Sequence, residues 1–217
     1  MTVRPHYPSP RARSADLFVH LLGLGLAVLG GAVLLWLGAQ DPSPGKLVVV
    51  SIYSLGAIAM FGFSTAYNFA GTELKLFLRR LDHMGIFLMI AATYTPFTAY
   101  LLSGTWAWAL TTSLWTLAGL GILGKIFLPP MSQKVWVPVY LGLAWIGAIA
   151  AFPLADVTSG IVLALLGVGG IFYSTGVVFY LNKRLQYAKA IWHGHVVAAA
   201  ASHWAAVLVG VSLVQSW

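Results

Sequence analysis

Seven long runs of hydrophobic residues, separated by short polar segments, dominate the pattern of this 217-residue chain. Each run is close to or above the roughly 20 residues that an α-helix needs to cross a bilayer. Lipid offers no hydrogen-bond partner to an exposed backbone, so crossings of this length must be helical. The pattern therefore predicts an all-α, polytopic membrane protein with seven transmembrane helices at about 15–39, 47–69, 81–102, 106–128, 135–152, 159–181 and 190–214.

The composition leaves almost no room for a soluble part. Hydrophobic residues make up 59% of the chain and charged residues only 8%, whereas soluble domains carry about 25% charged residues. We therefore expect 15–217 to form one transmembrane domain, without a separate catalytic or nucleic-acid-binding domain. The absence of cysteine from the sequence excludes disulfides, thiolate chemistry and cysteine-ligated metals.

Positive charges gather in alternate polar segments. The net charge is +7, and eleven of the 12 Lys and Arg residues lie in the N-terminal residues or near and after the ends of the second, fourth and sixth runs; the other one is Lys46. By the positive-inside rule, this bias predicts a basic cytoplasmic tail at 1–14, a cytoplasmic N-terminus and a C-terminus outside. The charges form no contiguous patch, so we expect no nucleic-acid partner.

A few polar residues lie inside the predicted spans, where an ionisable group costs at least about 2.5–3.5 kcal/mol at mid-membrane. Ser64 and Asn68 lie four residues apart on one helix face near the end of the second span. Asp82 opens the third span, His193 opens the seventh and His20 lies near the start of the first. Because all of these helix ends lie on the cytoplasmic side, the sequence predicts one polar pocket in the inner leaflet.

Other polar residues have simpler interpretations. We expect Asp16, His83 and His195 to be interfacial, hydrated side chains. His203 lies ten residues beyond His193, a rise of about 15 Å, so these two cannot share a metal. We expect His203 to form a hydrogen bond between helices.

Residues 79–87, RRLDHMGIF, followed by ATYTPF at 92–97, closely resemble the hemolysin III family. This family is the bacterial branch related to the progestin and adipoQ receptors, which include the adiponectin receptors. Further matches are Ser64-x-x-Tyr67, His20-x-x-Gly23 and Ile191-Trp192-His193 with His203. The resemblance covers essentially the whole transmembrane part and implies seven helices, with the N-terminus inside, in a bacterial cytoplasmic (inner) membrane.

The resemblance also implies an inner-leaflet zinc site formed by three histidines, with a nearby aspartate and serine bonded to a zinc-bound water. Ser64 and Asp82 occupy the serine and aspartate positions. The histidine four residues after the serine is replaced by Asn68. The other two histidines belong four residues apart, where this chain has Lys189 and His193.

The departures at two of the three ligand positions predict a degenerate zinc site. An amide oxygen is a poor zinc ligand and a protonated lysine is none, so we expect no resident cofactor. Zinc would require His20 or His83 as a replacement ligand. Without metal, Lys189 could form an ion pair with Asp82, or it could extend into the cytoplasmic headgroup layer.

We expect this chain to bind or sense a lipid-like ligand without metal, with membrane lipids as its partners. One alternative is a zinc-dependent intramembrane hydrolase of lipid amides. Two ligands are missing for it, and the order of residues shows no Ser-His-Asp set that would replace them. The other alternative is the pore-forming, haemolytic activity in the family's name. Polar residues at mid-span are sparse for a conducting pore.

Overall fold

The computed structural model describes residues 6–71, 73–129, 132–182 and 184–214. Within this part of the chain, seven helical segments are long and apolar enough to cross a membrane, which confirms the predicted seven-helix membrane protein. The elements are α1 (Pro10–Ala39), α2 (Pro44–Phe69), α3 (Lys75–Thr95), η1 (Pro96–Leu101), α4 (Gly104–Phe127), α5 (Gln133–Ile146), η2 (Gly147–Ala150), α6 (Ala151–Leu154), α7 (Gly160–Leu181), α8 (Ala188–Val207) and η3 (Leu208–Ser212).

Helix α3 begins at Lys75 rather than residue 81, and the other main differences from the predicted boundaries occur at prolines. Helix α1 begins at Pro10 rather than residue 15, because Ser9 caps it by accepting a hydrogen bond from the Ala12 N–H at 3.1 Å, and proline suits the first helical position. The fifth span continues to Leu154, since Pro153 lies in the first turn of α6, where its missing N–H is not needed. Pro96 begins a π-helical turn that continues the third span.

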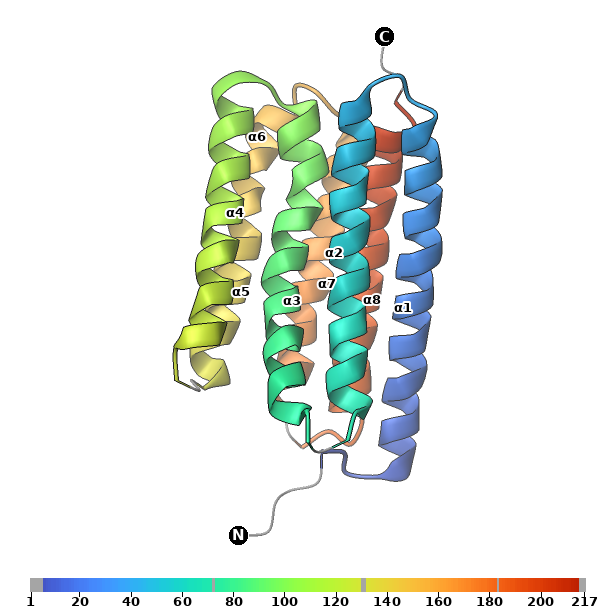
Figure 1. Cartoon of the computed structure of the whole chain (residues 1–217), viewed down its shortest axis with the longest axis vertical. Helices are drawn as coiled ribbons and strands as arrows, with labels where there is room; N and C mark the ends of the chain where they lie inside the picture. The colour runs from blue at the N-terminus through green and yellow to red at the C-terminus, as the bar shows by residue number, and fades with distance from the viewer. Residues whose placement is uncertain (1–5, 72, 130–131, 183, 215–217) are drawn as a thin grey trace.

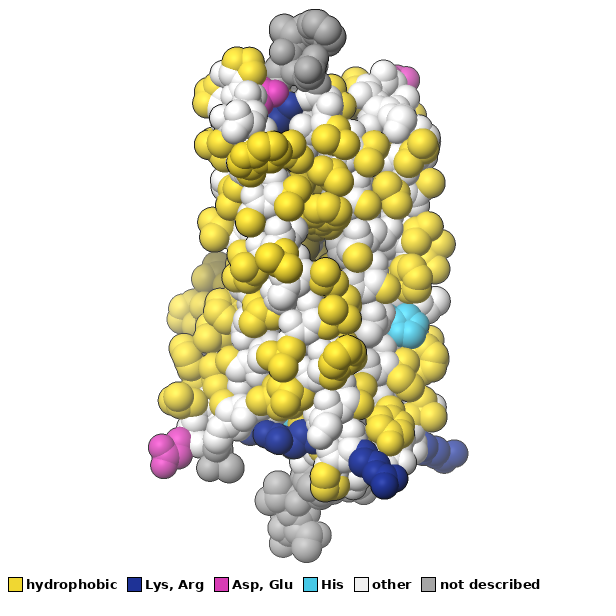
Figure 2. Space-filling view, turned by 90° about the vertical axis from the view of Figure 1, so that its right-hand side faces the viewer, with side chains coloured by type: hydrophobic (Ala, Val, Ile, Leu, Met, Phe, Trp, Pro, Cys, Tyr) yellow, Lys and Arg dark blue, Asp and Glu magenta, His cyan; other side chains and the backbone are white. Residues whose placement is uncertain are grey.

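The helices form a ring in which α1 packs against α2 and α8, α2 against α3, and α7 against α8. Helix α5 closes the ring through sparse contacts with α3, α4 and α7. Residues 6–9 and the connections α2–α3, α4–α5 and α7–α8 lie at the same end of the bundle (Figure 1). Lys and Arg side chains gather there, below sides covered by hydrophobic residues (Figure 2), and we call it the basic end.

Two apolar cores leave a cavity between them. The larger core centres on α2 and α8 and includes Tyr53, Phe61 and Val207, and the smaller one joins α3, α4 and α5 around Phe87 and Leu114. The cavity has a volume of about 1180 Å³ and is lined mainly by residues of α2, α3, α5, α7 and α8, with some of α1 and α4. It extends from the basic end into the apolar interior.

A glycine allows α1 to approach its neighbours closely beside this cavity. A Cβ atom at Gly23 would lie 2.6 Å from a ring carbon of Phe61 on α2 and 2.9 Å from a methyl group of Val197 on α8. The missing side chain therefore brings the N-terminal half of α1 against both helices. The polar residues of α1 described below depend on this approach.

The opposite end of the bundle holds a buried ion pair. Lys46 is 2% exposed; its ammonium lies 2.5 Å from the Asp41 carboxylate and also donates to the Val214 carbonyl. This is the single cation that the sequence places away from the other eleven. Because it is buried and paired, Lys46 joins the α1–α2 turn to the end of the last helix.

Removing this cation should destabilise the fold. We expect Lys46→Met to cost about 3–5 kcal/mol, because it removes the cation that neutralises the buried Asp41 carboxylate, and to lower the melting temperature of the detergent-solubilised protein. The double variant with Asp41→Asn should recover part of the loss. Lys134→Met, which removes an exposed lysine, is the control and should have little effect. Equal melting temperatures for Lys46→Met and Lys134→Met would contradict the assignment.

Candidate functional site

Helix α1 places a buried carboxylate at the basic end of the bundle. Asp16 is 0% exposed, so the expectation that it is a hydrated interfacial residue is wrong. Its Oδ2 accepts a hydrogen bond from the Tyr7 hydroxyl at 2.5 Å, and its Oδ1 lies 2.6 Å from His193 Nδ1 on α8. The carboxylate thus connects residues 6–9, which we call the N-terminal segment, with α1 and α8.

His20 lies one turn further along α1 and is 2% exposed. Its Nδ1 lies 2.8 Å from the backbone carbonyl of Asp16. Because a carbonyl only accepts, this bond fixes the proton on Nδ1 and leaves Nε2 as an acceptor. The Ser64 hydroxyl, from α2, lies 3.3 Å from this Nε2 and donates to it.

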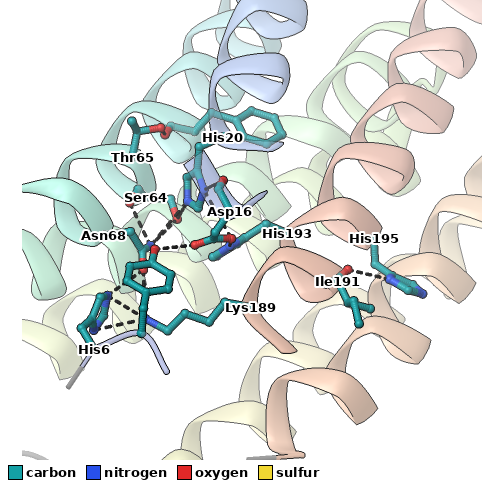
Figure 3. A network of polar contacts seen from close by, with 12 residues as sticks. His6, Asp16, His20, Ser64, Thr65, Asn68, Lys189, Ile191, His193 and His195 are labelled. Carbon is teal, nitrogen blue, oxygen red and sulfur yellow. Dashed lines mark hydrogen bonds and ion pairs between the residues drawn. The ribbon is translucent and has the colours of Figure 1, made fainter. Parts of the chain in front are cut away.

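Asn68 continues the network one turn beyond Ser64. Its amide nitrogen donates to the Ser64 backbone carbonyl at 3.0 Å and lies 3.5 Å from both Ser64 Oγ and His20 Nε2. Its amide oxygen faces Lys189 Nζ at 3.3 Å and a ring nitrogen of His6 at 3.0 Å. Figure 3 shows these side chains converging from the N-terminal segment, α1, α2 and α8.

The structure brings together five of the six residues that the sequence assigned to the pocket: His20, Ser64, Asn68, Lys189 and His193. Asp82 lines the same cavity, and its carboxylate lies 3.8 Å from the His83 ring. Among the described residues, no ion pair joins Lys189 to Asp82. Lys189 instead contacts the His6 ring, with Nζ 2.6 Å from Nε2.

The remaining histidines lie outside this network. His203 Nε2 bonds to the Leu166 carbonyl of α7 at 3.1 Å, which confirms the predicted hydrogen bond between helices. His195 bonds to the Ile191 carbonyl of its own helix, and the two lie apart from the side chains of the network (Figure 3). His83 similarly bonds to the Arg79 carbonyl and is partly buried rather than freely hydrated.

The zinc site implied by the sequence resemblance does not fit the residues present. Two of its three imidazole positions hold the Asn68 amide and the Lys189 ammonium, and these two groups are hydrogen-bonded to each other at 3.3 Å. An ammonium has no lone pair to give a metal, and its charge repels one. Only His193 keeps a zinc-type donor at these positions.

A different trio of donors is close enough to hold a metal ion. Ligand atoms of Asp16, His20 and His193 lie within 4.8 Å of one another and form a two-histidine, one-carboxylate set. Both Asp16 oxygens already have partners, Tyr7 and His193, and His20 Nε2 has Ser64. In this arrangement the donor atoms of Asp16 and His20 form a hydrogen-bonded network with Tyr7, Ser64 and His193.

Sequence reasoning missed His6, Tyr7 and the burial of Asp16. One signal was available, since Asp16 and His20 have the same four-residue spacing as Ser64–Asn68 and Lys189–His193, which places each pair on one helix face. His6 and Tyr7 lie in a proline-rich segment before α1 that has no periodic pattern. Their position becomes evident only in three dimensions.

Comparison with known proteins is consistent with this fold. Residues 13–204 match the family described as Haemolysin-III related. The chain is 33% identical over 195 residues to a hemolysin-3 homolog of Bacillus subtilis (strain 168), covering 89% of this chain and 92% of that protein. It is 31% identical to hemolysin-3 of Bacillus cereus, covering 89% of each chain. It is 28% identical over 208 residues to the human monocyte to macrophage differentiation factor, covering 92% of this chain and 84% of the relative.

The N-terminal segment covers the network at the basic end, and its ionisation reflects that position. Burial, and next the positive charge of Lys189, lower the pKa of His6 from 6.5 to about 4. Burial and the hydrogen bond to Asp16 raise the pKa of the Tyr7 hydroxyl. Both residues are therefore neutral at pH 7 when the segment is docked.

Docking of this segment should depend on pH. A free His6 gains a proton as the pH falls through 6.5, whereas the docked residue remains neutral until about pH 4. Docking is therefore fully favoured above pH 6.5 and weakens as the pH falls towards 4. A nitroxide attached through Pro8→Cys, in a chain that has no other cysteine, should become more mobile between pH 7.5 and 5.

The control carries the same label together with His6→Gln, which cannot take up this proton, and should show little change in mobility over that range. With native His6, the electron paramagnetic resonance spectrum of the Pro8→Cys label should differ between pH 7.5 and 5. Identical spectra would contradict pH-dependent docking through His6.

Proposed function

Because the chain belongs to the Haemolysin-III related family of seven-helix membrane proteins, we propose that it binds a lipid-like amphiphile in its central cavity, without zinc at the three-histidine position. The polar headgroup lies at the basic end and the hydrocarbon chain extends between the two cores. The cavity is the observation that carries this proposal. At about 1180 Å³ it exceeds the roughly 300–1,000 Å³ of typical small-molecule sites.

The lining of the cavity changes from polar to apolar with depth. Its deeper walls include Met60, Met89, Leu154, Leu163 and Leu166, which suit an acyl or isoprenoid chain. Its polar end is lined by the network described above and by additional cations, which are Arg79, Arg80, Lys125 and Arg184. Guanidinium and ammonium groups bind phosphate and carboxylate. We therefore expect an anionic headgroup.

The two alternatives have weaker support. A zinc-dependent hydrolase of the type implied by the resemblance needs imidazole ligands where Asn68 and Lys189 are bonded to each other. A conducting pore needs polar side chains through the full bilayer, whereas the deep wall of this cavity is mostly apolar and has only scattered polar residues such as Thr93 and His203. Neither alternative uses the combination of a large apolar space and a cationic rim.

The same charge distribution supports the orientation of the protein. The basic end carries cations from four separate segments of the chain (Figure 2), and Lys46 at the opposite end is buried in an ion pair. By the positive-inside rule, the basic end faces the cytoplasm in the inner membrane of a bacterium. The lipid headgroup would then come from the inner leaflet.

Filling the cavity should expel the ligand. Gly167 lies in the middle of the cavity-facing stripe of α7, formed by residues 163, 166, 167, 170, 173, 174 and 177, and a Cβ there would have open space around it. Gly167→Phe should therefore remove one retained lipid, measured by native mass spectrometry after incubation with phosphatidylglycerol vesicles. Phosphatidylcholine with the same acyl chains, which lacks net negative charge, should be retained less.

Gly119→Phe is the matched control for this experiment. Gly119 also lies within a helix and has open space around its Cβ, but it does not line the cavity. This variant should retain as much lipid as the native chain. Equal lipid retention by Gly167→Phe and Gly119→Phe would contradict binding in the cavity.

The orientation can be tested separately with two single-cysteine variants. Pro8→Cys lies at the basic end and Pro42→Cys in the α1–α2 turn at the other end, and both positions are exposed. A membrane-impermeant maleimide added to intact spheroplasts should label Pro42→Cys at once, and Pro8→Cys only after permeabilisation. The reverse labelling pattern would contradict the proposed orientation.

A further inference from the structure

We propose that the network at the cavity mouth is a metal-free serine esterase site, in which Ser64 is the nucleophile, His20 the general base and Asn68 an oxyanion donor. The substrate class is the carboxylic ester of a long-chain, anionic lipid. The inference rests on the proposed function, because the substrate is a lipid bound in the cavity. It concerns an activity that the order of residues along the chain did not indicate.

The orientation of the Ser64 hydroxyl is unusual for α2. Three other hydroxyls of this helix, those of Ser51, Ser54 and Thr65, each donate to the backbone carbonyl four residues earlier at 2.7 Å. Ser64 instead directs its hydroxyl to His20 Nε2 on α1, 3.3 Å away. A helical serine hydroxyl that points to an imidazole has the pairing needed to activate a nucleophile, and such pairs are often looser before substrate binds.

His20 has the tautomer that a general base requires. Its Nδ1–H is held by the Asp16 carbonyl, so Nε2 is free to take the serine proton. His83 and His195 have the same bond to the carbonyl four residues earlier. Among the described residues, however, only His20 combines this bond with a hydroxyl at its second nitrogen. The chain order is His before Ser, and such pairs occur in several orders because geometry defines them.

Asn68 and Lys189 can stabilise the carbonyl oxygen of the ester, which becomes negatively charged when Ser64 attacks. Asn68 Nδ2 lies 3.5 Å from Ser64 Oγ, so its N–H group borders the place where an attacked carbonyl oxygen would lie. Lys189 Nζ donates to the other end of the same amide, which polarises it towards donation. Donors arranged in this way stabilise a tetrahedral oxyanion, and removal of one typically costs about 10²–10³ in kcat.

Ser64 lies between the apolar wall and the basic end of the cavity, where the ester group of a bound lipid would lie between its acyl chain and its headgroup. Ser64, His20 and Asn68 all line the cavity, and Met60 and Phe61 line it one turn deeper on the same helix. The acyl chain can therefore lie along the apolar wall while its ester carbonyl reaches Ser64. The anionic headgroup then remains near Lys189 and Arg79 at the basic end.

The reaction balances with water as the only co-reactant. Ser64 Oγ attacks the ester carbon as its proton passes to His20 Nε2, and the carbonyl oxygen takes the charge facing Asn68. Collapse of the tetrahedral species breaks the bond to the alcohol oxygen, which receives the proton from His20. Water then attacks the acyl-serine, again through His20, and releases the fatty acid with Ser64 reprotonated.

A serine-directed covalent probe tests this assignment directly. An alkyl fluorophosphonate should form a bond from Ser64 Oγ to phosphorus with loss of fluoride, and peptide mass mapping of the native full-length protein should locate the adduct. His20→Gln should slow labelling about 10²–10⁴-fold, the usual loss on removal of a general base. Ser64→Ala should abolish labelling and hydrolysis of a long-chain p-nitrophenyl ester.

Ser54→Ala is the matched control, because its hydroxyl lies on the same helix but bonds to the Val50 carbonyl. It should label at the native rate. Treatment with a chelator should leave both labelling and hydrolysis unchanged. Loss of activity on chelation with recovery on added zinc would overturn the metal-free assignment, as would an adduct at another residue. Mapping on the native chain decides the question even if Ser64→Ala does not fold.

Lipid retention measured on the same preparation separates the two proposals. Retained lipid with an unlabelled Ser64 would overturn the esterase and leave the binding function in place. A labelled Ser64 without retained lipid, and with no effect of Gly167→Phe on hydrolysis, would support the nucleophile and overturn binding in the cavity.

Discussion

The buried carboxylate of Asp16 is the constraint on which the basic end of this protein depends. A charge removed from water must be matched by hydrogen bonds or an opposite charge. Here Tyr7 and His193 supply them from outside α1. Satisfying one side chain thus fixes where the N-terminal segment and α8 lie relative to α1. The backbone carbonyl of Asp16 also orients His20. The same residue therefore stabilises the fold and orients the imidazole of the site.

The sequence was sufficient for the seven helices because a continuous apolar run of about 20 residues crosses lipid with its backbone fully paired when it is a helix. The helix ends at Pro10 and Leu154 were harder to predict. Proline is tolerated in the first turn of a helix, so a proline in the sequence does not by itself mark a helix boundary. Within the site, His20, Ser64 and Asn68 could be assigned to a pocket from spacing and depth. The burial of Asp16 was indicated only by its four-residue spacing from His20, and no pattern in the sequence predicts where Tyr7, which donates to its carboxylate, lies.

The residues at the metal positions that the sequence resemblance implies are compatible with one another. Asn68 offers an amide oxygen and Lys189 an ammonium, and the two are bonded to each other. The positive charge of Lys189 therefore occupies the region in which a metal would otherwise supply it. Ser64 is left beside an imidazole. A site of this kind keeps a cation near the reacting groups while making the serine, rather than a bound water, the available nucleophile.

The sparse packing of α5 has a consequence for how a lipid reaches the interior. Separating two tightly packed helices forfeits many van der Waals contacts at once, whereas α5 has few to lose against α7, because its buried side chains pack in the core that it forms with α3 and α4. Pro138 also interrupts its backbone hydrogen bonding. The wall beside α5 is therefore the part of the ring that opens at least cost. A hydrocarbon chain can pass sideways from the bilayer into the cavity there, without its headgroup crossing the membrane.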